Sequence, residues 1–261
     1  TTTITINSNG NPNTNVTGLT PICAGQNAVF TITGTKDEII TYTGVTGIPI
    51  SPVTLDATGT STVTVSNAQT DQTITLGTAS SGSCPTTLTG KIFTIKVNPV
   101  GDANTNVTGN GPICTGENAI FTITGKAGDI IDYTGVVGVP ASPVTIDATG
   151  KVIVNVTSPL VDQTITLNTA TNGTCPTTLV GKTATVKVNS KPAKPLFNNI
   201  IQPTCTANGT ADVTNYLPSP ATYIFNPSSG ISIAAPGKIS AASGKYKFVV
   251  TNNGCTSDSS D

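Results

Sequence analysis

The chain has 261 residues and a formal net charge of −1 at pH 7, and it contains no His, Met or Trp. Only 10% of the residues are charged, so it lacks the basic surface that nucleic acids or anionic membranes require. Without His, the Ser-His and Cys-His arrangements of nucleophilic enzymes are excluded. No apolar run reaches the ~18 residues of a membrane-spanning helix. We therefore expect no enzyme activity, no nucleic-acid partner and no direct membrane insertion.

Residues 21–98 and 112–189 are one sequence written twice, at a constant offset of 91 and without a gap. PICAGQNAVFTITG returns as PICTGENAIFTITG, and each Cys aligns with a Cys. A period of this size corresponds to a small domain and exceeds the ~20–50 residues of a solenoid repeat. With the same offset, the opening residues align with the last strand of the first copy. We predict the following segments: the last strand of a preceding module at 1–8, module 1 at 9–98, module 2 at 99–189 and module 3 at 190–261.

Short alternating runs, separated by Gly, Pro and Asn, predict β-strands throughout module 1. In Ala28–Thr33, for example, Ala28, Phe30 and Ile32 share one face. Strands are expected at 16–22, 28–33, 38–43, 53–56, 60–66, 72–78 and 91–98. About seven strands in about 90 residues is typical of an immunoglobulin-like sandwich. We therefore expect an all-β chain of tandem immunoglobulin-like modules in an elongated array. The expected core residues are Phe30, Ile32, Ile40, Tyr42, Val53, Leu55, Val63, Val65, Ile74, Leu76, Phe93, Ile95 and Val97.

Module 3 is related to the first two modules but is not a third copy. Its last Cys is followed only by TSDSSD, whereas the corresponding Cys of each earlier module precedes another strand. We expect module 3 to lack its last strand; the alternative is that the leading strand of another chain completes it. The linker 189–195 carries two prolines, which favours an extended spacer.

The core expected for module 1 is thin for the length of the module, and small domains of this kind commonly carry disulfides. The cysteines divide evenly, two to a module, which favours one bridge within each module over other connectivities. The disulfides would place the protein in an oxidising compartment, hence outside the cell. Free thiols are the alternative interpretation. The expected pairs are Cys23 with Cys84, Cys114 with Cys175, and Cys205 with Cys255.

Acidic residues recur at matching positions of the two copies, beside turns or strand entrances. Asp at such positions commonly accepts hydrogen bonds from backbone amides, which we favour over calcium binding or acid–base chemistry. The residues concerned are Asp56, Asp71, Asp147 and Asp162.

The loop GDANTN between the first two modules is the best candidate for a metal site. Oxygen ligands from Asp102, Asn104 and Asn106 suit calcium, which could stiffen the joint. The first copy of the loop has Asn11 in place of Asp102, and this loss of charge argues against the site. We expect no cofactor beyond such a structural calcium.

Sugar binding usually needs exposed aromatic platforms. The candidates Tyr42 and Tyr133 lie in alternating strands, where burial is the easier explanation. No ligand-binding residue is identified by the sequence.

The third module reads PTCTANGTADVT and then SGKYKFVVTNNGCTS. It resembles the SprB-type repeat of giant gliding-motility adhesins of Bacteroidetes, which closes on G-x-Y-x-x-x-V-T-x-x-x-G-C-T. The matching residues are Gly244, Tyr246, Val250, Thr251, Gly254, Cys255 and Thr256, with one residue fewer between Thr251 and Gly254. Modules 1 and 2 resemble the PKD-like and Ig-like repeats of the same class of surface proteins.

This resemblance implies export by the type IX secretion system and display on the outer membrane exterior as a long filament. Its partners would be other modules of the same long chain, surface polysaccharide or substratum, and the motility machinery. The chain would then be a non-catalytic stalk for surface adhesion and gliding. The alternative is that it forms spacer or binding modules of a secreted multidomain polysaccharide-degrading enzyme.

Overall fold

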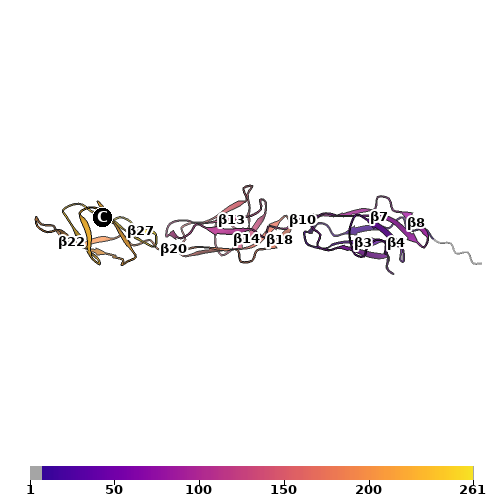
Figure 1. The fold of residues 1–261 in the computed structure, drawn as a ribbon, viewed down its shortest axis with the longest axis horizontal. Helices are drawn as coiled ribbons and strands as arrows, with labels where there is room; N and C mark the ends of the chain where they lie inside the picture. Colours follow the sequence, from indigo (N-terminus) through magenta and orange to yellow (C-terminus); the bar gives the residue numbers. More distant parts are fainter. Residues whose placement is uncertain (1–7, 261) are drawn as a thin grey trace, which may run out of the picture. The chain divides into compact units, whose positions relative to one another are not determined.

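A computed structural model describes residues 8–260 of the chain. All regular structure in this range is β-strand, as Figure 1 shows. Within these residues, no helix is long and apolar enough to cross a membrane. The strand expected at 1–8 lies outside the described residues except for Ser8.

The strands of the first repeat are β1 (Asn15–Gly18), β2 (Ile22–Cys23), β3 (Ala28–Thr33), β4 (Ile39–Thr43), β5 (Val53–Thr54), β6 (Thr60–Val65), β7 (Gln72–Ser81), β8 (Cys84–Thr87), β9 (Ile92–Ile95) and β10 (Val97–Asn98). Those of the second are β11 (Asn106–Gly109), β12 (Ile113–Cys114), β13 (Ala119–Thr124), β14 (Ile130–Thr134), β15 (Val144–Thr145), β16 (Lys151–Val156), β17 (Gln163–Asn172), β18 (Cys175–Thr178), β19 (Thr183–Val186) and β20 (Val188–Asn189). The remaining strands are β21 (Leu196–Ile201), β22 (Gly209–Thr214), β23 (Thr222–Asn226), β24 (Ile231–Ala235), β25 (Lys238–Ala241), β26 (Lys247–Asn252) and β27 (Cys255–Thr256).

Two sheets form the sandwich of the first repeat. One has the order β1-β3-β6, and the other has the order β5-β4-β7-β8, with β9 also paired to β7. The parallel pair β2 and β10 stands apart from both. The same arrangement recurs in the second repeat, with sheets β11-β13-β16 and β15-β14-β17-β18 plus β19, and the parallel pair β12 and β20.

Alternation of apolar and polar residues produces the core of the first repeat. The side chains of Phe30 and Ile32 are fully buried between the sheets, while Val29 and Thr33 on the opposite face are exposed. Of the expected core, the structure buries Phe30, Ile32, Ile40, Tyr42, Val53, Leu55, Val63, Ile74, Leu76 and Ile95. Val65, Phe93 and Val97 are partly buried and pack against this cluster. The expected all-β sandwich is therefore confirmed.

The residues after the second repeat form a different sandwich, with sheets β21-β22-β25-β24 and β23-β26-β27. Phe248 on β26 is buried at its centre and packs against Phe197 and Phe225, with ring centroids 4.7 and 5.3 Å away. Within the described residues no strand follows β27; instead, the backbone N–H groups of Ser257 and Ser260 donate to the carbonyls of Val250 and Phe248. The tail thus occupies part of the edge of β26.

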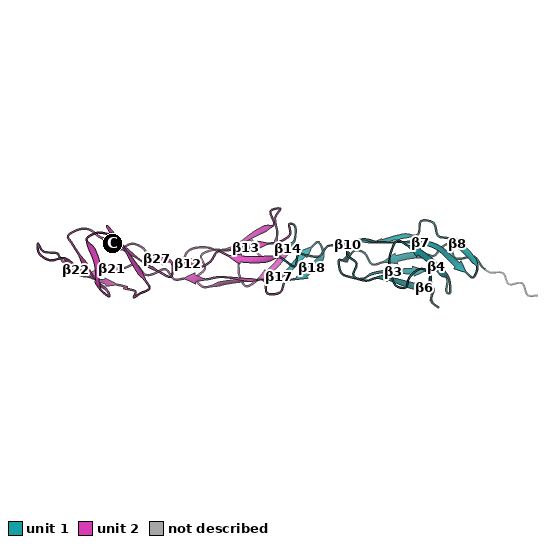
Figure 2. Cartoon of the chain, in the orientation of Figure 1, with its two compact units in different colours: residues 1–104, 128–130, 169–179 teal, residues 105–127, 131–168, 180–261 magenta. Residues whose placement is uncertain are grey.

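The chain divides into two compact units, coloured separately in Figure 2. Unit 1 comprises residues up to 104 together with 128–130 and 169–179. Unit 2 comprises 105–127, 131–168 and 180–261. The division into modules 1, 2 and 3 stays a prediction, and these names are used below only for the residue ranges 9–98, 99–189 and 190–261.

Candidate functional site at the module junctions

In modules 1 and 2, the first cysteine lies beside the last strand of the same module. In β2, Cys23 pairs with Asn98 of β10, the last strand of module 1. The N–H of Ala24 donates to the Asn98 carbonyl at 2.8 Å, and the Cys23 N–H donates to Oε1 of Gln26 at 2.8 Å. Cys114 is held against Asn189 of β20 in the same way. These contacts fix each cysteine beside the peptide that leaves its module.

The second cysteine of every module follows a two-residue hairpin turn. Ser81 pairs with Cys84, Asn172 with Cys175, and Asn252 with Cys255. The turns contain Gly82, Gly173 and Gly254, each with positive φ, which glycine adopts without steric cost. Each of these cysteines is therefore the first residue after a hairpin tip.

The disulfides join one module to the next. Cys23 is bonded to Cys175, with Cα atoms 5.5 Å apart, and Cys114 is bonded to Cys255, with Cα atoms 5.6 Å apart. Each bridge lies inside one compact unit. Cys84 and Cys205 are free thiols. The predicted pairing within modules, with one bridge in each module, is therefore wrong.

Strand length explains why Cys23 cannot reach Cys84. The start of β7, Gln72, pairs with Ile95, close to the β2–β10 pair that holds Cys23. The end of β7, Ser81, pairs with Cys84. The ten residues of β7 rise about 3.3 Å each, which separates its ends by about 30 Å. A disulfide requires Cα atoms within about 7 Å, so the two cysteines belong to different junctions.

Module 3 separates its cysteines similarly. β21 and β22 pair Leu196, which follows the linker, with Thr214, and they pair Ile201 with Thr210 at the other end. Cys205 lies in the loop beyond Ile201 and is exposed. Cys255 lies near the linker, where the side-chain amide of Asn189 donates to the Asn253 carbonyl at 2.8 Å. The predicted Cys205–Cys255 pair would join opposite ends of the module.

A buried carboxylate fixes the peptide that enters module 2. The backbone N–H of Asp102 donates to Oδ2 of Asp129 at 2.7 Å, and the side-chain amide of Asn172 donates to Oδ1 at 2.9 Å. The preceding residue, Gly101, donates its N–H to the Cys175 carbonyl at 3.1 Å. A Cβ at Gly101 would lie 2.0 Å from the Ala170 carbonyl oxygen, so only glycine fits. The junction thus combines a short peptide, a disulfide and a buried hydrogen-bonded anchor.

Module 1 has the same anchor with a longer side chain. Glu38 is 2% exposed, and its Oε1 accepts the Asn11 N–H at 2.6 Å. Its Oε2 accepts the Thr35 N–H at 3.0 Å and the Thr14 hydroxyl at 3.4 Å. Gly10 donates its N–H to the Cys84 carbonyl, as Gly101 does to Cys175. The entry of module 1 is therefore built like a junction, with Cys84 at its hairpin tip.

Between modules 2 and 3, side chains of the linker add to the bridge. Lys191 donates its N–H to the hydroxyl of Thr115 at 3.1 Å, and its ammonium lies 2.7 Å from Oδ1 of Asp258. The hydrogen bond to Lys191 is the main cause of the lowered pKa of Asp258. The linker is thus held at its first residues, on the side that carries the bridge.

Two of the candidate calcium ligands take part in local backbone structure. Oδ1 of Asp102 accepts the Asn104 N–H at 2.8 Å, which closes an Asx turn. Asn106 begins β11 and pairs with Thr124. Over residues 8–260, no group of three or more His, Cys, Asp or Glu side chains is placed to hold a metal ion. Calcium binding here stays a prediction.

The first pair of recurring Asp residues accepts hydrogen bonds from backbone N–H groups, as expected. Oδ1 of Asp56 accepts the N–H groups of Thr58 and Thr60, and hydrogen bonds from these threonines lower its pKa to about 2. Asp147 has the equivalent bonds and a lowered pKa.

The second pair of recurring carboxylates forms ion pairs. Asp71 binds Lys96, 2.6 Å away, and accepts the Val97 N–H; Lys96 is the main cause of its lowered pKa. Asp162 is bound in the same way by Lys187, with the same effect on its pKa. The interpretation of all four as structural residues is confirmed.

The two tyrosines are core residues. Tyr42 and Tyr133 are 5% and 4% exposed. Their hydroxyls donate to the carbonyls of Pro49 at 2.5 Å and Pro140 at 2.6 Å. Burial raises the pKa of both. Neither tyrosine can serve as a sugar platform.

Comparison with known proteins supports the fold alone. No protein-family model matches the chain, and no curated protein matches its sequence. Among solved structures, the chain is similar to the I-band fragment I67-I69 from titin, with a TM-score of 0.50 and 11% identity over 95% of this chain and 96% of that one. A variant of the same three-Ig fragment gives a TM-score of 0.50 and 11% identity, covering 96% and 98%. The ICAM-5 D1-D4 ectodomain fragment gives 0.45 and 12%, covering 94% and 74%. The sandwiches are therefore immunoglobulin-like.

Proposed function

We propose that the chain is a non-catalytic, load-bearing stalk segment of a long cell-surface adhesin or filament that serves surface adhesion and gliding motility. The observation that carries this proposal is the double covalent connection at each junction. Modules 1 and 2 are joined by the backbone and by Cys23–Cys175, and modules 2 and 3 by the backbone and by Cys114–Cys255. Tension that crosses a junction is shared between two covalent links.

This connectivity limits how far the chain lengthens when a module unfolds. A load that crosses module 2 can pass from Gly101 to Cys114 and leave through the second bridge. That route contains about 13 residues, or about 50 Å of extended chain at ~3.6 Å per residue. The parallel route enters at Cys175 through the first bridge and leaves along the backbone at Asn189, and residues 115–174 lie outside both routes. An unfolded module therefore stays short, which suits a stalk that must keep its reach.

The resemblance of the third module to SprB-type repeats favours display on the outer membrane exterior after type IX secretion. Its partners there are the other modules of the chain, a polysaccharide or substratum, and the motility machinery. The alternative function is a spacer or binding segment of a secreted polysaccharide-degrading enzyme. Tandem Ig-like modules suit this function as well.

An antibody against residues 99–189 tests the proposal on intact cells that produce the protein. We expect label on the cell surface that moves with time, and loss of the label after brief treatment with external protease. Label found only in the medium, in fractions that co-purify with polysaccharide hydrolysis, would contradict the stalk and support the spacer. Cells lacking the gene provide the control.

A further inference from the structure

The two free cysteines occupy the same places as bonded ones. Cys84 precedes Cys175 by 91 residues, the offset of the repeat, and both follow a hairpin tip. The carbonyls of both accept the N–H of the glycine that enters the module, Gly10 or Gly101, at 3.1 Å. Cys175 is bonded to the preceding module, whereas Cys84 has no such partner among residues 8–260.

Cys205 belongs to the series formed by the first cysteine of each module. Cys23, Cys114 and Cys205 are separated by 91 residues each, and each follows a Pro-x pair at 21, 112 and 203. The first two are bonded to the hairpin-tip cysteine of the next module. Cys205 is exposed, at the end of module 3 opposite the end that receives Cys114. The series therefore places Cys205 where a following module would be attached.

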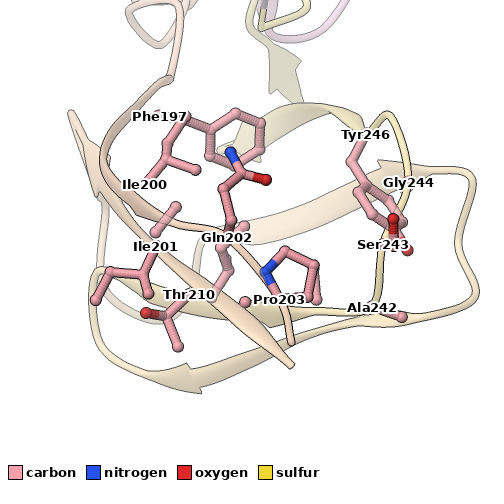
Figure 3. Close-up of a pocket in the computed structure, with 14 residues that line it drawn as sticks. Phe197, Ile200, Ile201, Gln202, Pro203, Thr210, Ala242, Ser243, Gly244 and Tyr246 are labelled. Carbon is pink, nitrogen blue, oxygen red and sulfur yellow. The ribbon is translucent and has the colours of Figure 1, made fainter. Parts of the chain in front are cut away.

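The surface beside Cys205 is open and partly apolar. A hollow of about 280 Å³ lies here. Figure 3 shows Ile200 and Ile201 on one side of it, Tyr246 on the other and Pro203 between them. Ile200 and Ile201 are 60% and 66% exposed. Pro203 also lines the adjoining hollow that contains Cys205. The hairpin tip of a following module would make apolar contacts here, next to the Cys205 thiol.

We propose that Cys84 and Cys205 pair with one another as the bonded cysteines do, so that Cys205 of one copy of this chain bonds Cys84 of a second copy, without the backbone link that accompanies the existing bridges. The bond forms by exchange with a disulfide oxidant such as oxidised glutathione. The Cys205 thiolate attacks one sulfur of the oxidant and expels one glutathione thiolate. The Cys84 thiolate of the second copy then attacks the Cys205 sulfur and expels the other. Two protein thiols lose two electrons and two protons, and the oxidant becomes two thiols.

Complementary single variants test this pairing. In Cys84→Ser only Cys205 is free, and in Cys205→Ser only Cys84 is free, while both existing bridges remain. Each variant is incubated alone, and the two are incubated together, with a mixture of oxidised and reduced glutathione. Products are separated by non-reducing electrophoresis and mapped by mass spectrometry of unreduced peptides. Circular dichroism verifies the fold, and Ala replaces Ser if either variant is misfolded.

We expect a disulfide-linked dimer only in the mixture, with Cys84 and Cys205 in one linked peptide, and a ladder of longer products from the unaltered chain. Dimers formed as readily by one variant alone would show unselective oxidation and overturn the proposal. Glutathione-capped monomers in every sample would overturn it as well, as would exchange of the existing bridges into a Cys23–Cys84 pair. The result does not depend on where the protein is displayed, so it is distinct from the outcome of cell labelling.

Discussion

Removal of the bridge between Cys23 and Cys175 should change how far module 1 extends under load. With the bridge present, tension entering at Gly10 reaches Cys23 and crosses directly to module 2. With Cys23→Ser and Cys175→Ser, tension must follow the backbone through all of module 1 to Asn98. The loaded path then grows from about 13 to about 88 residues, which corresponds to about 50 and about 300 Å of extended chain.

Force spectroscopy on single molecules held at both termini measures this difference directly. We expect the double variant to show one new unfolding step of about 300 Å, while module 2 still gives about 50 Å because Cys114–Cys255 remains. Reducing agent should convert every module to long steps. Cys84→Ser is the matched control and should leave all steps unchanged.

The same experiment separates this connectivity from bridges within modules. A Cys23–Cys84 pair would leave about 27 residues of module 1 in the loaded path, from Gly10 to Cys23 and from Cys84 to Asn98. That corresponds to a step of about 100 Å in the unaltered protein, which Cys84→Ser would lengthen. Such a step, or the absence of a new long step in the double variant, would refute the reasoning.

Three further predictions concern stability. A fragment of residues 99–189 contains Cys114 and Cys175 without their partners, so reducing agent should leave its melting temperature unchanged, as calorimetry can show. Glu38→Gln puts an amide N–H₂ group, which can only donate, beside the three groups that donate to Glu38: the Asn11 N–H, the Thr35 N–H and the Thr14 hydroxyl. This change should lower the free energy of unfolding by about 1–3 kcal/mol, measured in urea titrations followed by circular dichroism. The lowered pKa of Asp56, about 2 in the folded state, means that its contribution to stability is present above pH ~4 and lost as the pH falls towards 2. Melting temperatures measured across this range should fall less steeply in Asp56→Asn; an identical slope would contradict the assignment.

The sandwich could be predicted from the sequence because its causes are local. Alternation in Ala28–Thr33 alone fixes which face is buried, and the strand is found at these residues. The repeat then transfers the same assignment to β13, where Phe121 and Ile123 are fully buried. The turn role of Asp56 was equally accessible, since an Asp-Ala-Thr-Gly turn satisfies its own backbone groups.

The connectivity could not be predicted in this way because it depends on which end of a strand each cysteine occupies. Counting two cysteines to a module ignores the ~30 Å that ten residues of β7 place between them. The sequence does carry a signal, since the Gly-x-Cys of residues 82–84 and 173–175 marks a tight hairpin tip. The buried anchor Glu38 was also missed, although it begins the strand expected at 38–43 and lies on the same face as Ile40 and Tyr42.

A bridge at a junction stabilises two modules, whereas a bridge within a module stabilises one. Cys23 is held beside Asn98, and Cys175 beside Gly101, so the bridge lies next to the peptide that joins the modules. Whichever module unfolds, the bridge closes a loop of about 75 residues, which lowers the entropy of the unfolded chain by an amount worth about 4 kcal/mol. In an array of thin-cored modules, each module receives this contribution from both of its junctions. The modules at the ends of an array receive it only once, because a Cys84–Cys205 bond between two copies closes no loop of backbone.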